Sequence, residues 1–184
     1  IDPQSGTTLT LGTSGDTVTI PSGVSLAPGG GLTLTGALAV DGGTVKLDGN
    51  YPTGTDNVAL GDTALDSVAA DGNYNVAIGN KALTANTTGD LNNAIGCGAL
   101  DANTTGSFNV GIGGNALGSK IDDNSNTAVG QASNGGADGG SFSTSIGANS
   151  LAVNQASNNT AAGACSLNAN TTGANNTAVG FQSL

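Results

Sequence analysis

The 184-residue sequence contains no Glu, Arg, His, Met or Trp, and its 13 acidic residues are all Asp. Long helices are usually filled with Glu, Lys, Arg, Leu and Met, so this scarcity argues against an all-α protein. Acid–base and phosphoryl-transfer chemistry loses its usual side chains when His and Arg are absent. We therefore expect neither enzymatic activity nor a cofactor.

Positive charge and aromatic side chains are scarce as well. Lys46, Lys81 and Lys120 are the only cations, and the net charge is -10. Nucleic-acid binding is not expected, because phosphate neutralisation needs Lys and Arg. No apolar run is long enough to span a bilayer, and 3% aromatic residues argue against a large single core. The chain starts at Ile1 without a signal peptide or Met, so we expect a processed product or part of a longer polypeptide.

Gly, Asn, Thr and Asp are abundant instead, and they are arranged in a repeat of about 17 residues in eight units. A glycine anchors each unit, with a large aliphatic residue usually before it and Leu usually four residues after it. A small residue stands two positions before the glycine, and Asn or Ser stands four before it. Asn-Thr-Thr-Gly recurs as a turn signal at a fixed place in the unit, as in 86–89. The anchoring glycines are Gly61, Gly79, Gly96, Gly113, Gly130, Gly147, Gly163 and Gly180.

A unit of this length is too short for a helical-hairpin repeat. The segment before each glycine predicts a short strand, and the Ala/Ser-Leu pair after it predicts a second strand or an extended corner. One unit then forms one coil of an all-β parallel solenoid, with coils about 4.8 Å apart.

Stacking would place like residues on like and so create ladders. The Asn ladder is predicted to comprise Asn57, Asn75, Asn92, Asn109, Asn126, Asn159 and Asn176. The core is predicted to comprise Ile78, Ile95, Ile112, Val129, Ile146, Val179, Leu65, Leu83, Leu100, Leu117, Leu151 and Leu167. Tyr74, Phe108 and Phe142 recur five residues before their glycines, and we interpret them as core or corner fillers rather than as a ligand platform.

An isolated coil buries too little for its own stability. About two large aliphatics, at roughly 1.5–3 kcal/mol each, oppose about 1–2 kcal/mol of backbone entropy for every residue. Homo-oligomerisation would bury a second surface. Our hypothesis is that the alternating Ala and Gly residues of the predicted strands form the seam between chains.

Residues 1–55 lack the repeat and predict a slender β-structured stem, with strands at Thr8–Leu11, Thr17–Ile20, Gly31–Leu34 and Thr44–Leu47. Residues 56–184 form the eight-coil repeat region. The boundary falls near Asn50–Asp56, where Pro52 and Gly54 mark a join.

Candidate chemical sites are few. Asp122 and Asp123 could suggest carboxylate catalysis or Ca²⁺ binding, but we interpret them as solvated turn residues and expect no metal site; an ion on an oligomer axis would have no assignable ligand. Cys97 and Cys165 lie four coils apart, about 19 Å at the strand spacing, whereas a disulfide needs at most about 7 Å. Two unpaired thiols in core or corner positions are predicted. The glycine-rich segment 135–140 is either a neutral flexible loop or a protruding contact loop.

The repeats resemble the head repeats of trimeric autotransporter adhesins (YadA-like), as in Asn75-Val76-Ala77-Ile78-Gly79. The longer form at 170–184 and the stem phrase at 14–23 are more similar to phage tail fibre proteins. This resemblance implies a homotrimer of left-handed parallel β-rolls. It also implies a structural attachment fibre of a virion that binds other tail proteins and a host-surface receptor, either glycan or protein.

Three other functions stay open. A cellular surface adhesin or extracellular fibre would differ from a virion fibre in what anchors it. The Thr8-Leu9-Thr10 and Thr17-Val18-Thr19 phrases suggest an ice-binding solenoid, although they do not recur in the repeat units. A polysaccharide-degrading fibre is the fourth class. Membrane insertion is not expected.

Overall fold

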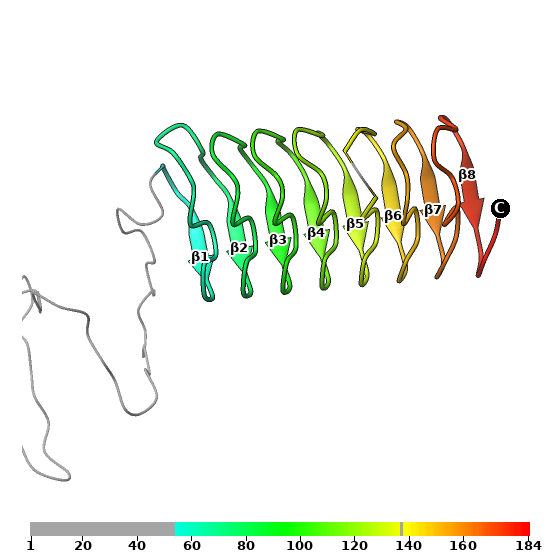
Figure 1. Cartoon of the computed structure of the whole chain (residues 1–184), viewed down its shortest axis with the longest axis horizontal. Coiled ribbons are helices and arrows are strands. Elements are labelled where there is room, and N and C mark those ends of the chain that lie inside the picture. The colour runs from blue at the N-terminus through cyan, green and yellow to red at the C-terminus, as the bar shows by residue number, and fades with distance from the viewer. Residues whose placement is uncertain (1–53, 137) are drawn as a thin grey trace, which may run out of the picture. The chain divides into compact units, whose positions relative to one another are not determined.

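The repeat region is an all-β solenoid in which every coil contributes one short strand to a single parallel sheet (Figure 1). The computed structural model describes residues 54–136 and 138–184, and these residues contain no helix. From the first of the eight strands to the last, the chain makes about seven full turns of the solenoid. The strands are β1 (Val58–Leu60), β2 (Val76–Ile78), β3 (Asn93–Ile95), β4 (Val110–Ile112), β5 (Thr127–Val129), β6 (Thr144–Ile146), β7 (Thr160–Ala162) and β8 (Thr177–Val179).

The strands pair in sequence order, and the register follows the repeat. Ala77 pairs with Ala94, and Ile78 pairs with Ile95, so like residues stack as predicted. The anchoring glycines also stack, with φ between 123° and 137°, a region that L-residues avoid. A β-carbon on Gly79 would lie 2.6 Å from the carbonyl oxygen of Gly96. Glycine is required here both by the backbone angle and by the close approach of neighbouring coils.

The interior of each coil is narrow, and in most coils it is filled mainly by one leucine. The six leucines expected in the core are buried; Leu65, Leu83 and Leu100 are fully inaccessible. They face what we call the inner column, the central residue of each strand, which is Ala in most coils. A β-carbon on Gly111 of this column would lie 3.3 Å from Leu100 Cδ1. The space between the strand and the leucine therefore admits only small side chains on the strand.

The large aliphatic residues before the glycines lie outside the coil, and this corrects the sequence-based core. Successive strand residues point to opposite faces, so a buried inner column forces both neighbours outward. Ile95, Ile112, Ile146 and Val179 are exposed, while Ile78 and Val129 are half-buried. The physical reason is the narrow interior, which accepts Ala opposite Leu but has no room for Ile. The hypothesis that the small strand residues form the seam between chains is wrong as well. These residues, such as Ala77 and Ala94, are buried inside the coil and cannot contact another chain.

The Ala/Ser-Leu segment forms a corner and contains no strand among the described residues. Each leucine adopts a left-handed backbone conformation, as at Leu83 (φ 52°) and Leu100 (φ 54°). Hydrogen bonds still join this layer from coil to coil, because the amide of Leu83 donates to the Ala99 carbonyl at 3.0 Å. The corner is thus a stacked second layer without strand geometry. The predicted stem, including its four strands and the boundary near residue 55, lies outside the described residues.

Candidate functional site

The Asn ladder is buried and acts as a hydrogen-bonding spine along the coils. The amide of Asn92 donates to Asn75 Oδ1 at 2.9 Å, and the amide of Asn109 donates to Asn92 Oδ1 at 3.0 Å. Most of these side chains also donate across their own coil, as Asn75 Nδ2 does to the Gly89 carbonyl at 2.8 Å, but the buried Nδ2 of Asn126 has no hydrogen-bond partner. A buried amide is costly unless it is paired, so this network fixes both the coil spacing and the turn. The ladder is structural.

The Asn-Thr-Thr-Gly phrase closes the turn at the same end of the coil as the Asn ladder, because Asn75 Nδ2 and Asn86 Nδ2 both donate to the Gly89 carbonyl. Asn86 Nδ2 donates to the Gly89 carbonyl at 3.0 Å, and Asn103 Nδ2 donates to Asn86 Oδ1 at 2.9 Å. The phrase is therefore a second column of stacked amides, and its role is also structural.

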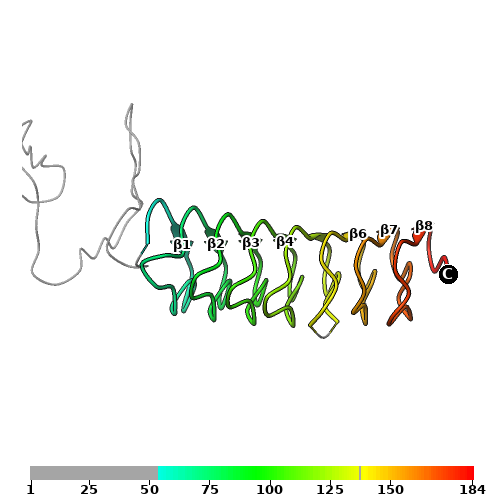
Figure 2. The ribbon, with the colours of Figure 1, turned by 90° about the horizontal axis from the view of Figure 1, so that it is seen from above.

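The outer face of the sheet is mainly apolar: the third residue of every strand is Leu, Ile, Val or Ala, whereas the first is Val in three strands and Asn or Thr in the others. We define it as the first and third residues of every strand together with the residue five before each glycine. Figure 2 shows the strands along one side of the stack and the rest of each coil on the other side, so no other part of the repeat covers this face. Asp56 is the one charged residue among these positions. Exposed members include Leu60, Tyr74, Leu91, Ile95, Phe108, Ile112, Phe142, Ile146 and Val179.

The three aromatic residues are corner residues with exposed side chains. Tyr74, Phe108 and Phe142 have φ of 58°, 62° and 58° and exposed fractions of 53%, 59% and 64%. A bulky side chain in the left-handed region is strained, and here every coil has a residue in that conformation at this position. The backbone of the corner demands the conformation, and the side chain is turned outward onto the outer face.

The fifth coil interrupts the apolar interior. Asn134 takes the place of the leucine and is fully buried, and neither its Oδ1 nor its Nδ2 has a hydrogen-bond partner. Opposite it, Ser145 replaces the usual Ala and contacts the hydroxyl groups of Ser133, at 2.5 Å, and Ser150. The buried apolar residues consequently form two clusters, one ending at Ala128 and the other containing Leu151.

A buried lysine lies beside this interruption. Lys120 occupies a position where neighbouring coils carry the second Asn column, and its Nζ donates to the carbonyls of Gly139 and Asn154, each at 2.8 Å. Nζ lies 3.4 Å from Asp123 Oδ2, and both side chains are almost inaccessible. Burial lowers the pKa of Lys120 and raises that of Asp123, while the attraction between the two charges opposes both shifts. Asp123 is therefore a buried partner, which corrects its interpretation as a solvated turn residue; Asp122 is exposed.

Carboxylate groups of Asp122, Asp123 and Asp138 lie within 4.8 Å of one another. Their oxygens already serve the protein: Asp138 Oδ1 accepts from the Ile121 amide at 2.8 Å, and Asp123 Oδ2 accepts from the Gly139 amide at 3.0 Å. Lys120 supplies the positive charge. The cluster is thus an internal clamp on the glycine-rich segment 135–140, whose Gly136 and Gly140 are buried. The two alternatives for that segment, a neutral flexible loop or a protruding contact loop, stay predictions.

Cys97 and Cys165 are free thiols, as predicted. Both lie at corners, Cys97 exposed and Cys165 half-buried, and neither is in the core. Cys97 Sγ lies 3.8 Å from Asn80 Oδ1.

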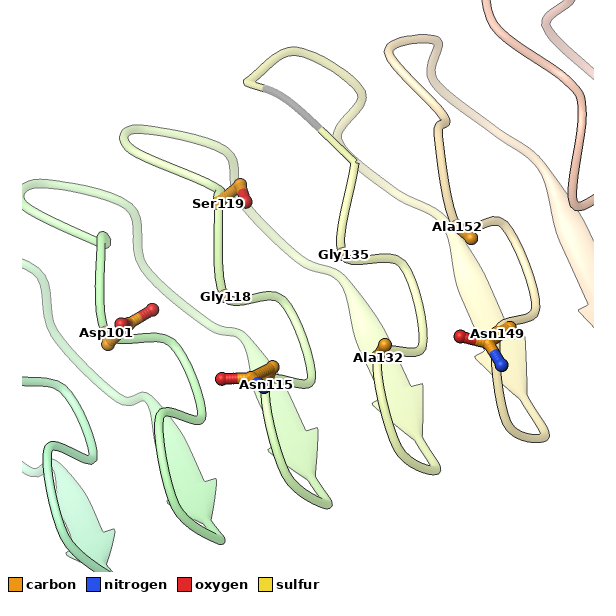
Figure 3. Close-up of a pocket in the computed structure, with 8 residues that line it drawn as sticks. All are labelled: Asp101, Asn115, Gly118, Ser119, Ala132, Gly135, Asn149 and Ala152. Carbon is orange, nitrogen blue, oxygen red and sulfur yellow. The ribbon is translucent and has the colours of Figure 1, made fainter.

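A hollow of about 440 Å³ opens on the layer opposite the sheet (Figure 3). It spans four coils and is lined by Asp101, Asn115, Gly118, Ser119, Ala132, Gly135, Asn149 and Ala152. Of these residues, only Gly135 lies in a segment that the sequence pattern had marked, the glycine-rich segment 135–140. The sequence held one indication of the hollow, five residues after each anchoring glycine. This position is glycine in two successive coils, Gly118 and Gly135, whereas other coils have Asp66, Thr84, Asp101, Ala152 or Asn168 there.

The chain matches no protein-family model, no curated protein and no solved structure. Within the described residues, no helix could span a membrane.

Proposed function

We propose that this chain forms a rigid homotrimeric rod in an attachment fibre of a virion, a phage tail fibre. Its partners are two sister copies, other tail proteins and a receptor on the host surface. The observation that carries the proposal is the outer face, where the third residue of every strand forms an apolar strip that repeats at the same place in consecutive coils and where Asp56 is the one charged position. Contiguous exposed apolar surface marks interaction sites.

The partner that fits this strip is another copy of the same strip. Each coil presents its outer residues at one height, so chains that are related by rotation about an axis along the rod meet like residues with like. A rotation that closes on itself forms a ring and leaves no unpaired strip. The net charge of -10 makes copies of the chain repel one another. Because charged side chains are almost absent from the outer face, this repulsion is weakest where two outer faces meet. The number three and the left-handed winding come from the resemblance to trimeric head repeats.

The rod serves attachment mechanically. Coils joined by the glycine, asparagine and leucine columns transmit force from one to the next, and three chains present any weak receptor contact three times. Linked weak contacts gain strength from their high effective concentration.

Sedimentation equilibrium of the chain and of two variants tests the assembly. We expect three times the 17.4 kDa of one chain. Ile112→Asp places a charge on the outer face and should dissociate the assembly. The matched control is Ile121→Asp, which changes an exposed isoleucine outside the outer face and should leave the mass unchanged. A folded monomer of the unaltered chain would refute the assembly.

Immunogold labelling with antibodies against residues 56–184 tests the location. Labelled tails on virions are expected. Labelled cell envelopes without virions would favour the surface adhesin instead.

A further inference from the structure

We propose that the hollow opposite the sheet binds a neutral saccharide of two or three rings; this inference rests on the proposed function and names the receptor chemistry for one of its surfaces. The sheet face is occupied by sister chains in the proposed rod. The lining residues lie on the other layer of the coil, in front of the strands in Figure 3, and Asn115 and Ser119 are exposed.

The hollow exists because two successive coils lack a side chain where others have one. Gly118 and Gly135 lie in the same column, so a trough runs along the rod between Asp101 at one end and Ala152 at the other. A β-carbon on Gly135 would come within 3.3 Å of the Ala132 carbonyl oxygen, which is tight but close to ordinary contact. Gly135 does not have a positive φ. The glycines are therefore not demanded by the backbone, and the space they leave is available to a ligand.

The dimensions suit a short oligosaccharide. The lining residues come from four consecutive coils, which makes the trough roughly 14 Å long at the strand spacing. Its volume of about 440 Å³ falls within the range of roughly 300–1,000 Å³ that is typical of ligand sites.

The lining chemistry indicates a neutral, hydroxyl-rich ligand. Asp101 offers a carboxylate that accepts hydrogen bonds, Asn115 and Asn149 offer amides that donate and accept, and Ser119 offers a hydroxyl group. The lining includes no cation, and the chain is strongly acidic, so an anionic sugar would be repelled. Small residues on the floor leave room for a ring to approach the backbone.

Asp101 is prepared for such a ligand. Partial burial raises the pKa of its carboxyl group above the ordinary value, with the nearby Lys81 opposing the shift. A carboxylate that is already partly shielded from water loses less hydration when a hydroxyl group replaces the solvent, and hydrogen bonds to a charged acceptor are the stronger kind.

The test uses the complete chain in its assembled state and a panel of immobilised di- and trisaccharides, neutral and acidic, followed by titration calorimetry with the best neutral sugar. We expect neutral sugars to bind without calcium. Gly135→Thr fills the trough, and Asp101→Ala removes the acceptor. Each should weaken binding by about tenfold or more, the loss expected for a hydrogen bond to a charged group. Asp66→Thr places the same side chain in the same column outside the hollow and should leave binding unchanged.

Three outcomes overturn the inference: no neutral sugar binds, only acidic sugars bind or calcium is required, or Gly135→Thr and Asp101→Ala bind as well as the parent. If Gly135→Thr fails to assemble by sedimentation, Asp101→Ala and Asn149→Ala decide the question alone. Failure of the inference is distinguishable from failure of the proposed function. A trimer that adsorbs to host cells but ignores sugars refutes only the saccharide site, whereas a chain that does not assemble refutes the rod whatever sugar it binds.

Discussion

The interruption in the fifth coil should be repairable by one substitution, Asn134→Leu. Asn134 is fully buried with both polar side-chain atoms unpartnered, and a buried unpaired amide costs about 1–3 kcal/mol. A leucine in its place would join the buried apolar residues on either side, and burial of such a side chain contributes about 1.5–3 kcal/mol. Both effects act in the same direction.

One effect opposes them. Position 134 has φ of 47°, and the left-handed region suits Asn better than Leu by about 1 kcal/mol. The neighbouring coils show that the fold holds leucine at this angle, because Leu167 has φ of 46° and is buried. We therefore expect Asn134→Leu to raise the free energy of unfolding by about 2–4 kcal/mol per chain.

Thermal unfolding followed by circular dichroism measures the effect. For a repeat region of this size the midpoint should rise by roughly 5–15 °C. Adding Ser145→Ala should raise it further, because the serine hydroxyl faces the new leucine. The reverse exchange Leu100→Asn in the regular part of the stack is the matched control and should lower the midpoint by a comparable amount. An unchanged or lower midpoint for Asn134→Leu would refute this reasoning, because it would show that the Asn134 side-chain amide contributes to the stability of the fifth coil.

Three further predictions concern the columns and the charges. Gly96→Ala should destabilise the fold by about 3 kcal/mol or more, because its φ is 135° and its β-carbon would lie 2.6 Å from the Gly113 carbonyl oxygen. Gly114→Ala, whose nearest neighbour is 3.8 Å away, should change stability by less than about 0.5 kcal/mol, and urea titration compares the two. Asn92→Ala should cost about 1–3 kcal/mol, since it leaves the Asn109 amide without its acceptor and removes one of two side-chain donors from the Gly106 carbonyl, the other being Asn103 Nδ2; the exposed Asn80→Ala serves as its control in the same titration, and equal losses would contradict the role of the ladder. The unfolding midpoint should rise as the pH falls from 7 toward 4, because burial raises the pKa of Asp101 above 3.8, so that the folded state binds a proton there more tightly than the unfolded chain does. Asp101→Asn should reduce that rise, and a midpoint that falls over the same pH range would refute the argument.

The winding of the chain could be predicted from sequence because the repeat and the physics of stacking point to the same register. Strands at 16–18-residue intervals pair like residues with like. The anchoring glycines have positive φ and, except at Gly180, a neighbouring backbone too close for a β-carbon, and only glycine satisfies both conditions. Alternation along a strand fixes two faces but not which face points inward. The size and apolar character of Ile78 predicted that it lies in the core of the coil. The structure puts Ala77 inside because Leu83 and its equivalents, which come from another layer, already fill the narrow coil.

The corners were harder to predict, because their residues violate local preferences. Leucine, tyrosine and phenylalanine rarely adopt positive φ, so nothing in their identity indicates a left-handed corner. Every coil has a left-handed residue at both corner positions, Leu, Tyr or Phe in many of them, and hydrogen bonds to the neighbouring coils support the conformation. Lys120 illustrates the same difficulty. Its alignment with an asparagine column was visible, but its burial depends on Asp123 and on carbonyls up to two coils away.

The fifth coil and the outer face together explain how an interrupted interior remains compatible with a rigid rod. In a solenoid, each coil is stabilised mainly by its neighbours, so a polar coil weakens the coupling between the two halves. The interior changes from apolar to polar at Asn134 and Ser145, but the outer face continues across the same coils through Val129 and Ile146. In the proposed trimer those outer residues are buried between chains, and the seam supplies the continuity that the interior lacks. The Lys120–Asp123 pair adds a second tie by binding Gly139 of the next coil and Asn154 of the coil after it. In the proposed trimer, apolar contacts with the sister chains and the buried Lys120–Asp123 ion pair both stabilise the fifth coil. Its polar interior therefore does not make it a hinge.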